Sequence, residues 1–446
     1  MLLSRLRQAL QEFRSASAGN VAITFGLAFL PIICGVGAAV DYSRANSVKV
    51  KLQAAIDSTA LMLSKEAATD TSDQLQANAS KYFLAMFNPP GVQNTTISAT
   101  YSSSGGTSLV IDGSTLASTT LMHVFGIDTI KVGSTSTVKW GSTRLRVAMA
   151  LDNTKSMQQS GKMDALKSAA TNFLSQMQSA ATTNGDVYVS IIPFSTSVNV
   201  GATNYTQSWL TWTDYGKCNG ASGWGYDDYT HALCDARGGH WSAYAASKQQ
   251  YWTGCVADRG GTNGPTGSNY DTNVDTPNIG DPATLFPAVD YSDCPQQALG
   301  LSYDWSTMSS LINSMSPNGY TNQNIGLALG WMSLVGGGPF TVPATSPGYD
   351  YEKIIILFTD GLNTENRWYT DQSSIDDRET MTCDNIKAAG ITLYTVQIST
   401  DGTAPSSLLQ NCASDSSKFF YLTSSSQLVT TFNQIGISLS NLRIAK

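Results

Sequence analysis

The chain has 446 residues, which is enough for about two or three domains with a substantial core. Its formal net charge is −7 and only 13% of its residues are charged, so no basic surface argues for nucleic-acid binding. The low charge, together with abundant Gly, Ser, Thr, Asn and Tyr, favours an extracytoplasmic protein.

Residues 21–40 are twenty consecutive positions without a formal charge, most of them apolar. A helix of this length crosses roughly 30 Å of hydrocarbon. A cleaved signal peptide is the alternative, but its apolar core would be shorter, and no small-x-small cleavage site is followed by an ordinary mature start. We therefore predict a short cytoplasmic tail over residues 1–20 and a retained transmembrane helix over residues 21–40.

The orientation of this helix is not decided by charge, because three basic residues lie on each side of it. The cysteines beyond the span, and the absence of a cytosolic motif, favour a tail inside and the bulk of the chain outside. The three basic residues before the span are Arg5, Arg7 and Arg14, and the three after it are Arg44, Lys49 and Lys51.

Residues 41–90 are expected to extend the helix outward, because apolar positions from Val48 to Leu63 recur at helical spacing. Residues 91–143 then show short alternating runs separated by Ser-Gly-rich turns, with one helical turn at residues 122–125. This pattern predicts a small β-rich α+β unit that serves as a spacer or an assembly surface.

The N-terminal segments at residues 19–22, 40–42 and 52–61 resemble the N-terminal region of TadE/TadG-type proteins of the tight adherence (Flp) pilus assembly system. The resemblance implies a single-pass protein of the bacterial inner membrane with a periplasmic bulk. Type IV prepilins are cut after a glycine and carry a glutamate five residues into the mature chain. After Gly19 that position is Thr24, so we expect the anchor to stay attached.

Residues 144–446 alternate between apolar strand-like runs and amphipathic helical runs, which predicts a doubly wound, mostly parallel sheet. The expected strands are 145–151, 187–194, 353–359, 391–398 and 418–422, and the expected helices are 163–177, 307–315, 325–334, 374–389 and 425–443. Together with the N-terminal segments, this gives an α/β protein with a transmembrane or pilin-like helix and a small β-rich unit.

A segment of about residues 195–303 departs from this alternation and is expected to be a large insertion with its own structure. It contains four cysteines, which allow three pairings. A transition-metal site from His231, Cys234, Asp235 and His240 is the alternative, although the spacing matches no strong signature. Its tryptophans are expected to pack the insertion rather than to face a partner or a glycan: Trp209, Trp212, Trp224, Trp241 and Trp252.

The cysteines outside the apolar span form an even set of six without any Cys-x-x-Cys spacing. Such a set favours disulfides in an oxidising compartment over a structural zinc site. Cys383 and Cys412 lie at similar points of the last two strand-helix units, so we expect them to pair. The remaining four are Cys218, Cys234, Cys255 and Cys294.

Three loops carry candidate metal ligands. Asp152 ends the first strand of the main domain, and Thr154 and Ser156 follow at alternate positions. These hard oxygen donors suit Mg²⁺, Mn²⁺ or Ca²⁺, although such a triplet occurs on the order of once by chance in a chain this rich in Ser and Thr. Thr321 lies in a second loop that runs into a helix, and Asp360 ends another apolar strand.

Three loops in this order resemble the metal-ion-dependent adhesion site of von Willebrand factor A domains. The resemblance implies that one Mg²⁺, or Mn²⁺ or Ca²⁺, is held by Asp152, Thr154, Ser156, Thr321 and Asp360, with one open position for an Asp or Glu carboxylate of a partner. Thr154 stands where serine is usual. Lys155 sits between the two hydroxyl ligands, where it would weaken cation affinity or help to hold an anionic ligand. The alternative is a doubly wound domain without a metal site, in which these loop acids only cap helices.

The combination of anchor and A-like domain is the order found in TadG-like members. It implies a non-enzymatic, membrane-anchored pilus assembly or adhesion protein whose partners are other pilus components or surface proteins. The main alternatives are a metal-dependent hydrolase of the cell envelope and a released surface adhesin. The hydrolase is disfavoured because the chain has three histidines and neither a His-Glu-x-x-His nor a Gly-x-Ser-x-Gly motif.

Overall fold

The structure is a computed structural model that divides into two compact units, Met1–Trp140 and Gly141–Lys446. Most of the expected cytoplasmic tail lies outside the described part of the chain, as does Trp224. The structure describes residues 18–64, 66–67, 70–102, 107–140, 143–181, 183–221, 229–260 and 268–444.

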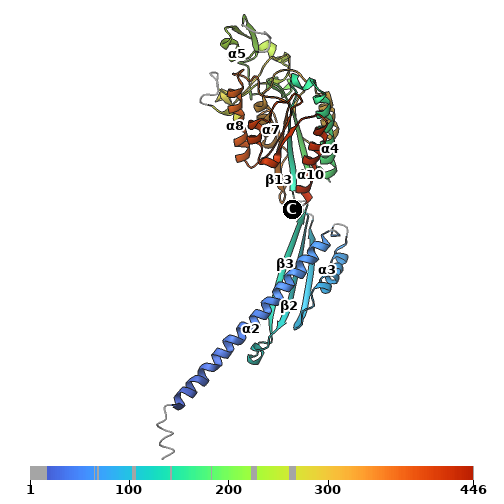
Figure 1. Cartoon of the computed structure of the whole chain (residues 1–446), viewed down its shortest axis with the longest axis vertical. Helices are drawn as coiled ribbons and strands as arrows, with labels where there is room; N and C mark the ends of the chain where they lie inside the picture. The colour runs from blue at the N-terminus through green and yellow to red at the C-terminus, as the bar shows by residue number, and fades with distance from the viewer. Residues whose placement is uncertain are drawn as a thin grey trace, which may run out of the picture. The chain divides into compact units, whose positions relative to one another are not determined.

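The first unit is built on one long helix, α2 (Ala18–Leu63), which includes the expected span and continues without a break beyond it. Within the described residues, it is the helix that is long and apolar enough to cross a membrane, by length and composition. A second helix, α3 (Ser72–Met86), begins at a capping box in which Thr71 and Gln74 exchange hydrogen bonds. In Figure 1 the N-terminal part of α2 extends past the rest of the unit.

A three-stranded antiparallel sheet completes this unit, in the order β1-β2-β3. One face of the sheet packs on α2 and α3, with Leu52, Ile56, Phe83 and Ile111 in the shared core. A short 3₁₀ turn, η1 (Met122–Phe125), lies in the connection between the second and third strands. The strands are β1 (Val92–Ser102), β2 (Thr107–Ser118) and β3 (Thr129–Trp140).

The second unit contains a six-stranded sheet in the order β12-β5-β4-β13-β14-β15, as the predicted doubly wound fold requires. All neighbouring strands are parallel except β12, which pairs antiparallel with β5 at one edge. The central strands are buried on both faces because they are almost continuously apolar. The strands are β4 (Thr143–Asp152), β5 (Val187–Phe194), β12 (Leu299–Ser302), β13 (Asp350–Thr359), β14 (Thr392–Ile398) and β15 (Phe419–Leu422).

Helices cover both faces of this sheet (Figure 1). On one face, α4, α6 and α10 pack through residues such as Phe173 and Phe432, whose rings meet edge to face. On the other face lie α7, α8 and α9, and α7 is buried along most of its length. The helices are α4 (Lys162–Ala180), α6 (Trp305–Ser314), α7 (Gln323–Val335), α8 (Gln372–Ala388), α9 (Ser407–Cys412) and α10 (Gln427–Ile444).

The insertion is shorter than expected, because β12 falls inside the range 195–303 and belongs to the main sheet. The short run Leu-Gly-Leu-Ser lacks a strand pattern of its own, so only its pairing with β5 reveals it. The rest of the insertion is mostly loops, joined by two-residue and four-residue strand pairs. Its elements include β6 (Val198–Asn199), β7 (Leu210–Thr211), β8 (Gly216–Asn219), α5 (His231–Ala236), β9 (His240–Ala243), η4 (Ala246–Tyr251), β10 (Cys255–Val256) and β11 (Phe286–Pro287).

Three disulfides are present in this unit: Cys218–Cys234, Cys255–Cys294 and Cys383–Cys412. The last is the pair that the sequence predicts, and the first two resolve the three possible pairings of the insertion. Since Cys234 is bonded to sulfur, it has no thiolate to offer a metal. The alternative transition-metal site with His231, Asp235 and His240 is therefore wrong.

The tryptophans of the insertion that the structure describes pack within it. Trp252 is buried, and its ring lies edge to face with that of Trp212 at 5.7 Å. Trp209 meets Phe286 in the same geometry at 6.1 Å, and Trp241 stacks on the imidazole of His231. These aromatic pairs supply part of the apolar contact that a segment with little regular structure otherwise lacks.

Candidate metal centre

The strand register brings the first and third loops together. In the parallel pair β4 and β13, Leu151 lies opposite Phe358, so Asp152 is level with Thr359 and one residue from Asp360. Both strands end at the carboxyl edge of the sheet, where open α/β sheets bind ligands. The sheet order therefore places two carboxylates from distant parts of the chain at one point.

Hydrogen bonds connect the acids and hydroxyls of these two loops. The Oδ1 atom of Asp152 accepts from the backbone N–H of Thr154 at 2.8 Å and from its hydroxyl at 2.6 Å. Ser156 Oγ lies 3.0 Å from Thr154 Oγ1 and donates to Asp360 Oδ1 at 2.6 Å. The other oxygen of Asp152 accepts from the hydroxyl of Thr359 at 2.7 Å. Four of the five expected ligand residues thus form one connected cluster.

The fifth residue, Thr321, lies in the loop before α7 and lines the same surface pocket as Ser156 and Asp360, which has a volume of about 550 Å³. The loop is attached to the first one, because the N–H of Lys155 donates to the carbonyl of Gly319 at 3.0 Å. Gly319 has a φ of +86°, and a Cβ there would overlap the carboxylate of Asp293. Only glycine therefore fits this turn.

Asp152 is fully buried, so its carboxylate is kept away from solvent. Burial, followed by the nearby Asp360 carboxylate, raises the pKa of Asp152, while the hydrogen bonds from Thr154 act in the opposite direction. A cation placed between the two carboxylates would remove this unfavourable interaction.

Lys162, the first residue of α4, is a site residue that sequence reasoning missed. Its ammonium group forms an ion pair with Asp360 Oδ2, and both side chains are almost completely buried. Lys155, the lysine that the sequence singled out, is exposed at the rim of the pocket. Nothing in the spacing marks Lys162, because its approach to Asp360 depends on how α4 enters the fold. With the positive charge of Lys162 included, the set of Asp152, Asp360 and Lys162 has a net charge of −1.

Two further residues of the pocket, Asp401 and Thr403, come from the loop after β14. The backbone N–H of Thr403 donates to the Asp401 carboxylate at 3.0 Å and lowers the pKa of that carboxyl to about 2. A fourth loop therefore adds a permanent negative charge to the rim. Its acid follows a parallel strand by three residues, so the strand-end rule could have pointed to it.

Residues of the insertion form hydrogen bonds with the second and third loops of the site. Asp258 is fully buried and accepts from Asn322 Nδ2 at 2.7 Å and from the N–H of Arg367 at 3.3 Å. Burial raises the pKa of Asp258 to about 6. The guanidinium of Arg367 also pairs with Asp214 at 2.8 Å. The insertion is thus part of the structure that positions Thr321 and the loop after Asp360.

The donor set fits a hard divalent cation. It consists of carboxylate and hydroxyl oxygens, and the described residues lining the pocket include neither histidine nor cysteine. Mg²⁺, Mn²⁺ and Ca²⁺ prefer such oxygen ligands, whereas softer metals prefer nitrogen and sulfur. Asp152, Thr154, Ser156, Thr321 and Asp360 would hold the ion, directly or through water.

Two protein families match parts of this chain. The Flp pilus-assembly TadE/G-like family, Tad, matches residues 19–68. The von Willebrand factor type A domain family matches residues 272–434, which include the second and third loops of the site. A comparison with curated proteins finds no match.

Three of the solved structures that this chain matches illustrate the low degree of similarity. The pilus adhesin SpaC from Lactobacillus rhamnosus GG has 12% identity and a TM-score of 0.37, over 80% of this chain and 36% of that one. The vWF domain of the type V pili tip protein Mfa5 from Porphyromonas gingivalis has 11% identity and a TM-score of 0.36, over 68% and 96%. Proximal thread matrix protein 1 from the mussel byssus, with a zinc-occupied MIDAS motif, has 12% identity and a TM-score of 0.34, over 67% and 46%. The chain thus spans about a third of the length of SpaC.

Proposed function

We propose that this TadG-like protein, which joins a TadE/G-like N-terminal region to a von Willebrand factor type A domain, is a membrane-anchored pilus assembly or adhesion protein. In the proposal, α2 anchors the chain once in the bacterial inner membrane, and the remainder lies in the periplasm. The A domain holds a divalent cation of the Mg²⁺ type and binds a protein partner through it.

One observation carries the proposal: Asp152, Thr154, Ser156 and Asp360 form a single hydrogen-bonded cluster at the carboxyl edge of a parallel sheet. A cluster of oxygen donors around two buried acids, open to a surface pocket, is suited to a cation that also has a position for an external ligand.

The partner chemistry follows from the charge of the site. Asp152, Asp360 and Lys162 together carry one negative charge, so a bound divalent cation would leave one positive charge. An incoming Asp or Glu carboxylate can neutralise this charge and complete the coordination of the ion. Lys155, exposed at the pocket rim, adds a positive charge that offsets the negative charge of Asp401 on the same rim and attracts an acidic partner. The bound ion would supply the Lewis acidity that holds this carboxylate. The residues of the chain would orient the ion and leave one side of it open.

We propose binding without turnover. The hydroxyl–carboxylate pair of the pocket, Ser156 and Asp360, consists of two of the expected cation ligands, and Asp360 is also ion-paired with Lys162. In the proposal these groups hold the ion and do not act as nucleophile and general base. The proposal therefore assigns the site to adhesion or assembly rather than to hydrolysis.

Water-proton relaxation with Mn²⁺ tests the proposal directly, because Mn²⁺ replaces Mg²⁺ at oxygen sites and reports its own bound water. The detergent-solubilised full chain is titrated with Mn²⁺, and then with acetate or, as a matched neutral control, acetamide. We expect bound Mn²⁺ to enhance relaxation, and acetate alone to reduce the enhancement by displacing water.

The possible failures are distinct. No enhancement on adding the protein would remove the cation site from the account. An enhancement that acetate leaves unchanged would leave a cation site that does not bind a carboxylate, and the adhesive mechanism would be wrong.

A further inference from the structure

The tip of the β2–β3 hairpin exposes a group of large apolar side chains. Leu121, Val124, Phe125 and Ile127 are all exposed, and Val124 is 77% exposed. They lie in and around η1, a turn of four residues, so they have no helix or sheet face of their own to pack on. A contiguous apolar group on a short loop marks contact with a membrane or a protein.

The tip is fixed to α2 by a buried carboxylate. Asp41 is 2% exposed and accepts from the backbone N–H groups of Thr120 and Leu121 at 2.9 Å and of Met122 at 2.7 Å. Three backbone donors on one carboxylate orient the turn and hold it against the helix. Arg44, one turn further along α2, donates to the hydroxyl of Thr120.

A close contact between Gly37 and Leu121 determines the position of the hairpin tip along the axis of α2. A Cβ at Gly37 would lie 2.9 Å from the Cβ of Leu121, so the hairpin approaches the helix where glycine leaves room for it. Gly37 lies inside the apolar stretch 21–40. Because an α-helix rises 1.5 Å per residue, Gly37 is about 4.5 Å from the outer end of that stretch at Val40.

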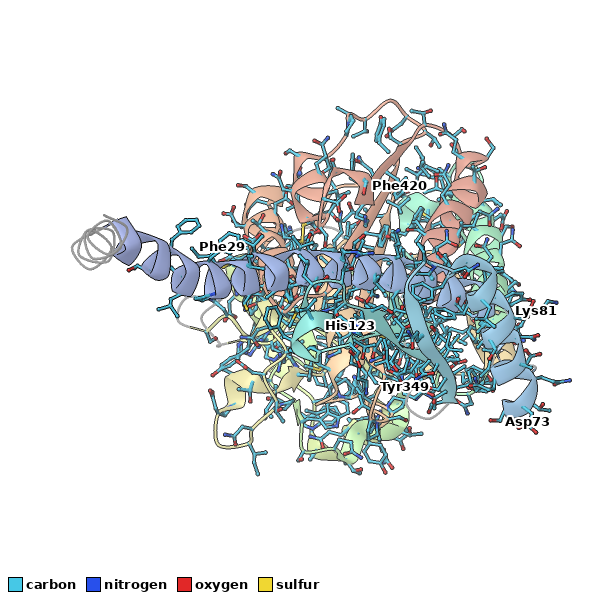
Figure 2. All side chains as sticks on the ribbon, turned by 90° about the horizontal axis from the view of Figure 1, so that it is seen from below. Phe29, Asp73, Lys81, His123, Tyr349 and Phe420 are labelled. Atoms are coloured by element: carbon cyan, nitrogen blue, oxygen red, sulfur yellow. A yellow bond between two sulfur atoms is a disulfide. The ribbon has the colours of Figure 1, made fainter. Side chains whose placement is uncertain are left out.

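The helix around this height is also apolar and exposed, at Val36 and Val40. The polar side chains at the tip are paired with each other, since His123 Nδ1 lies 2.6 Å from Asp128 Oδ1. In Figure 2, Phe29 projects from the free part of α2, His123 lies beside the middle of the helix, and Lys81 lies on α3 at the far end. The apolar tip is thus continuous with the apolar half of the helix.

We propose that the hairpin tip is a second membrane contact, in which Leu121, Val124, Phe125 and Ile127 enter the outer boundary of the bilayer beside α2. The proposal rests on the proposed function in one respect, namely that α2 is the membrane anchor. Apolar side chains of interfacial segments typically enter this boundary to a depth of about 5–10 Å. Contact at two points fixes the tilt of the first unit on the membrane, which a single helix does not.

Site-directed spin labelling of the full chain in phosphatidylethanolamine/phosphatidylglycerol vesicles tests this. One sample carries the label on the native Cys34, and the others carry it on Val124→Cys or Lys81→Cys in a Cys34→Ser background. Val124 is exposed, so its substitution leaves the fold intact. Lys81 is an exposed control on the same unit. Power saturation with oxygen reports lipid exposure, and saturation with a nickel chelate reports water exposure.

We expect the Val124 label to gain oxygen accessibility and lose nickel accessibility relative to the Lys81 label, as the Cys34 label does. If Cys34 is in lipid while Val124 is as accessible to nickel as Lys81, the tip contact is wrong and the anchor stands. If Cys34 is accessible to nickel, the anchor fails and the tip proposal fails with it. A Val124 label shielded from both reagents would show that protein, and not lipid, covers the tip.

Discussion

Ser156 donates a hydrogen bond of 2.6 Å to Asp360 across a sequence separation of 204 residues. The two residues follow neighbouring parallel strands, β4 and β13, so the contact is a direct consequence of the sheet order. It joins two of the three loops through protein atoms alone. The cation site therefore needs little rearrangement of these loops when an ion binds, which limits the entropic cost of binding.

Lys162→Met should raise cation affinity. The substitution keeps the apolar stem and removes the ammonium group that repels a divalent ion beside Asp360. We expect at least about a tenfold gain in Mg²⁺ affinity, or 1.4 kcal/mol, measured by calorimetry. Without Mg²⁺ the variant should be less stable by about 3 kcal/mol, because the buried Asp360 loses its partner.

Lys155→Met is the matched control for this substitution, since Lys155 is exposed and two hydroxyl ligands flank it in sequence. It should change the stability of the protein little. If Lys155→Met and Lys162→Met changed Mg²⁺ affinity equally, the assignment of Lys162 as the competing cation would be wrong.

Thr321→Ala should weaken Mg²⁺ binding while the domain stays folded. Its side chain lines the pocket from the second loop, where it can offer one hydroxyl oxygen to the ion. Loss of one neutral ligand should cost about 1 kcal/mol or more, which calorimetry can measure. Thr380→Ala, an exposed threonine of α8, is the control. Equal affinities for Thr321→Ala and Thr380→Ala would exclude the second loop from the site.

Glu379→Gln should flatten the pH dependence of stability. Burial raises the pKa of Glu379 from 4.5 to about 8, and Asn363 donates to it at 2.7 Å. Between these values the folded protein keeps a proton that the unfolded chain has released. The free energy of unfolding should therefore fall as the pH rises through this window, by at most about 1.4 kcal/mol per pH unit.

Urea unfolding at pH 5, 6.5 and 8, followed by tryptophan fluorescence, checks this. Eight of the nine tryptophans lie beyond Trp140, so the signal reports the second unit. Asp377→Asn, an exposed neighbour on α8, should keep the slope of the wild type. Asp152 and Asp258, whose pKa values are also raised, leave a smaller slope in Glu379→Gln. A slope as steep as that of the wild type in Glu379→Gln would contradict the assignment.

Replacing both Cys218 and Cys234 with alanine should destabilise the insertion and leave Mg²⁺ affinity nearly unchanged. The disulfide closes a loop with a sequence separation of 16 and packs in a small separate cluster with Leu233 and Tyr229. Loss of such a cross-link costs about 3 kcal/mol. Thermal unfolding and calorimetry of the same sample check both statements. Lost affinity in a folded variant would show that this part of the insertion shapes the site.

Much of the site could be predicted because its acids end apolar strands. Parallel strands bring their carboxyl ends to one edge, so Asp152 and Asp360 were expected at the same edge once the strands were recognised. Their direct proximity follows from the pairing of β4 with β13, which the structure shows. Lys162 gave no such signal, because its contact with Asp360 depends on how the start of α4 packs against the loop after β13. The support that Asp258 and Arg367 give to the loops was equally hidden, because contacts between distant loops depend on three-dimensional packing.

In the fold, too, some elements could be predicted from the sequence and others depend on three-dimensional packing. The apolar runs at β4 and β13 are long and continuous, and their pattern alone predicts buried strands. The edge strand β12 has only four residues, one of them Gly300, and it is recognisable only through its partner β5. In the insertion, cysteine spacing allowed three pairings, and only the structure selects one.

Calorimetric titration of the detergent-solubilised full chain with Mg²⁺ and Mn²⁺, wild type against Asp152→Ala, tests the central claim most directly. The wild type should bind one ion per chain, and Asp152→Ala should lose this binding. Asp164→Ala, an exposed acid on α4, should bind as the wild type does. Identical isotherms for the wild type and Asp152→Ala would contradict the account and leave a pilus-associated scaffold without a cation site.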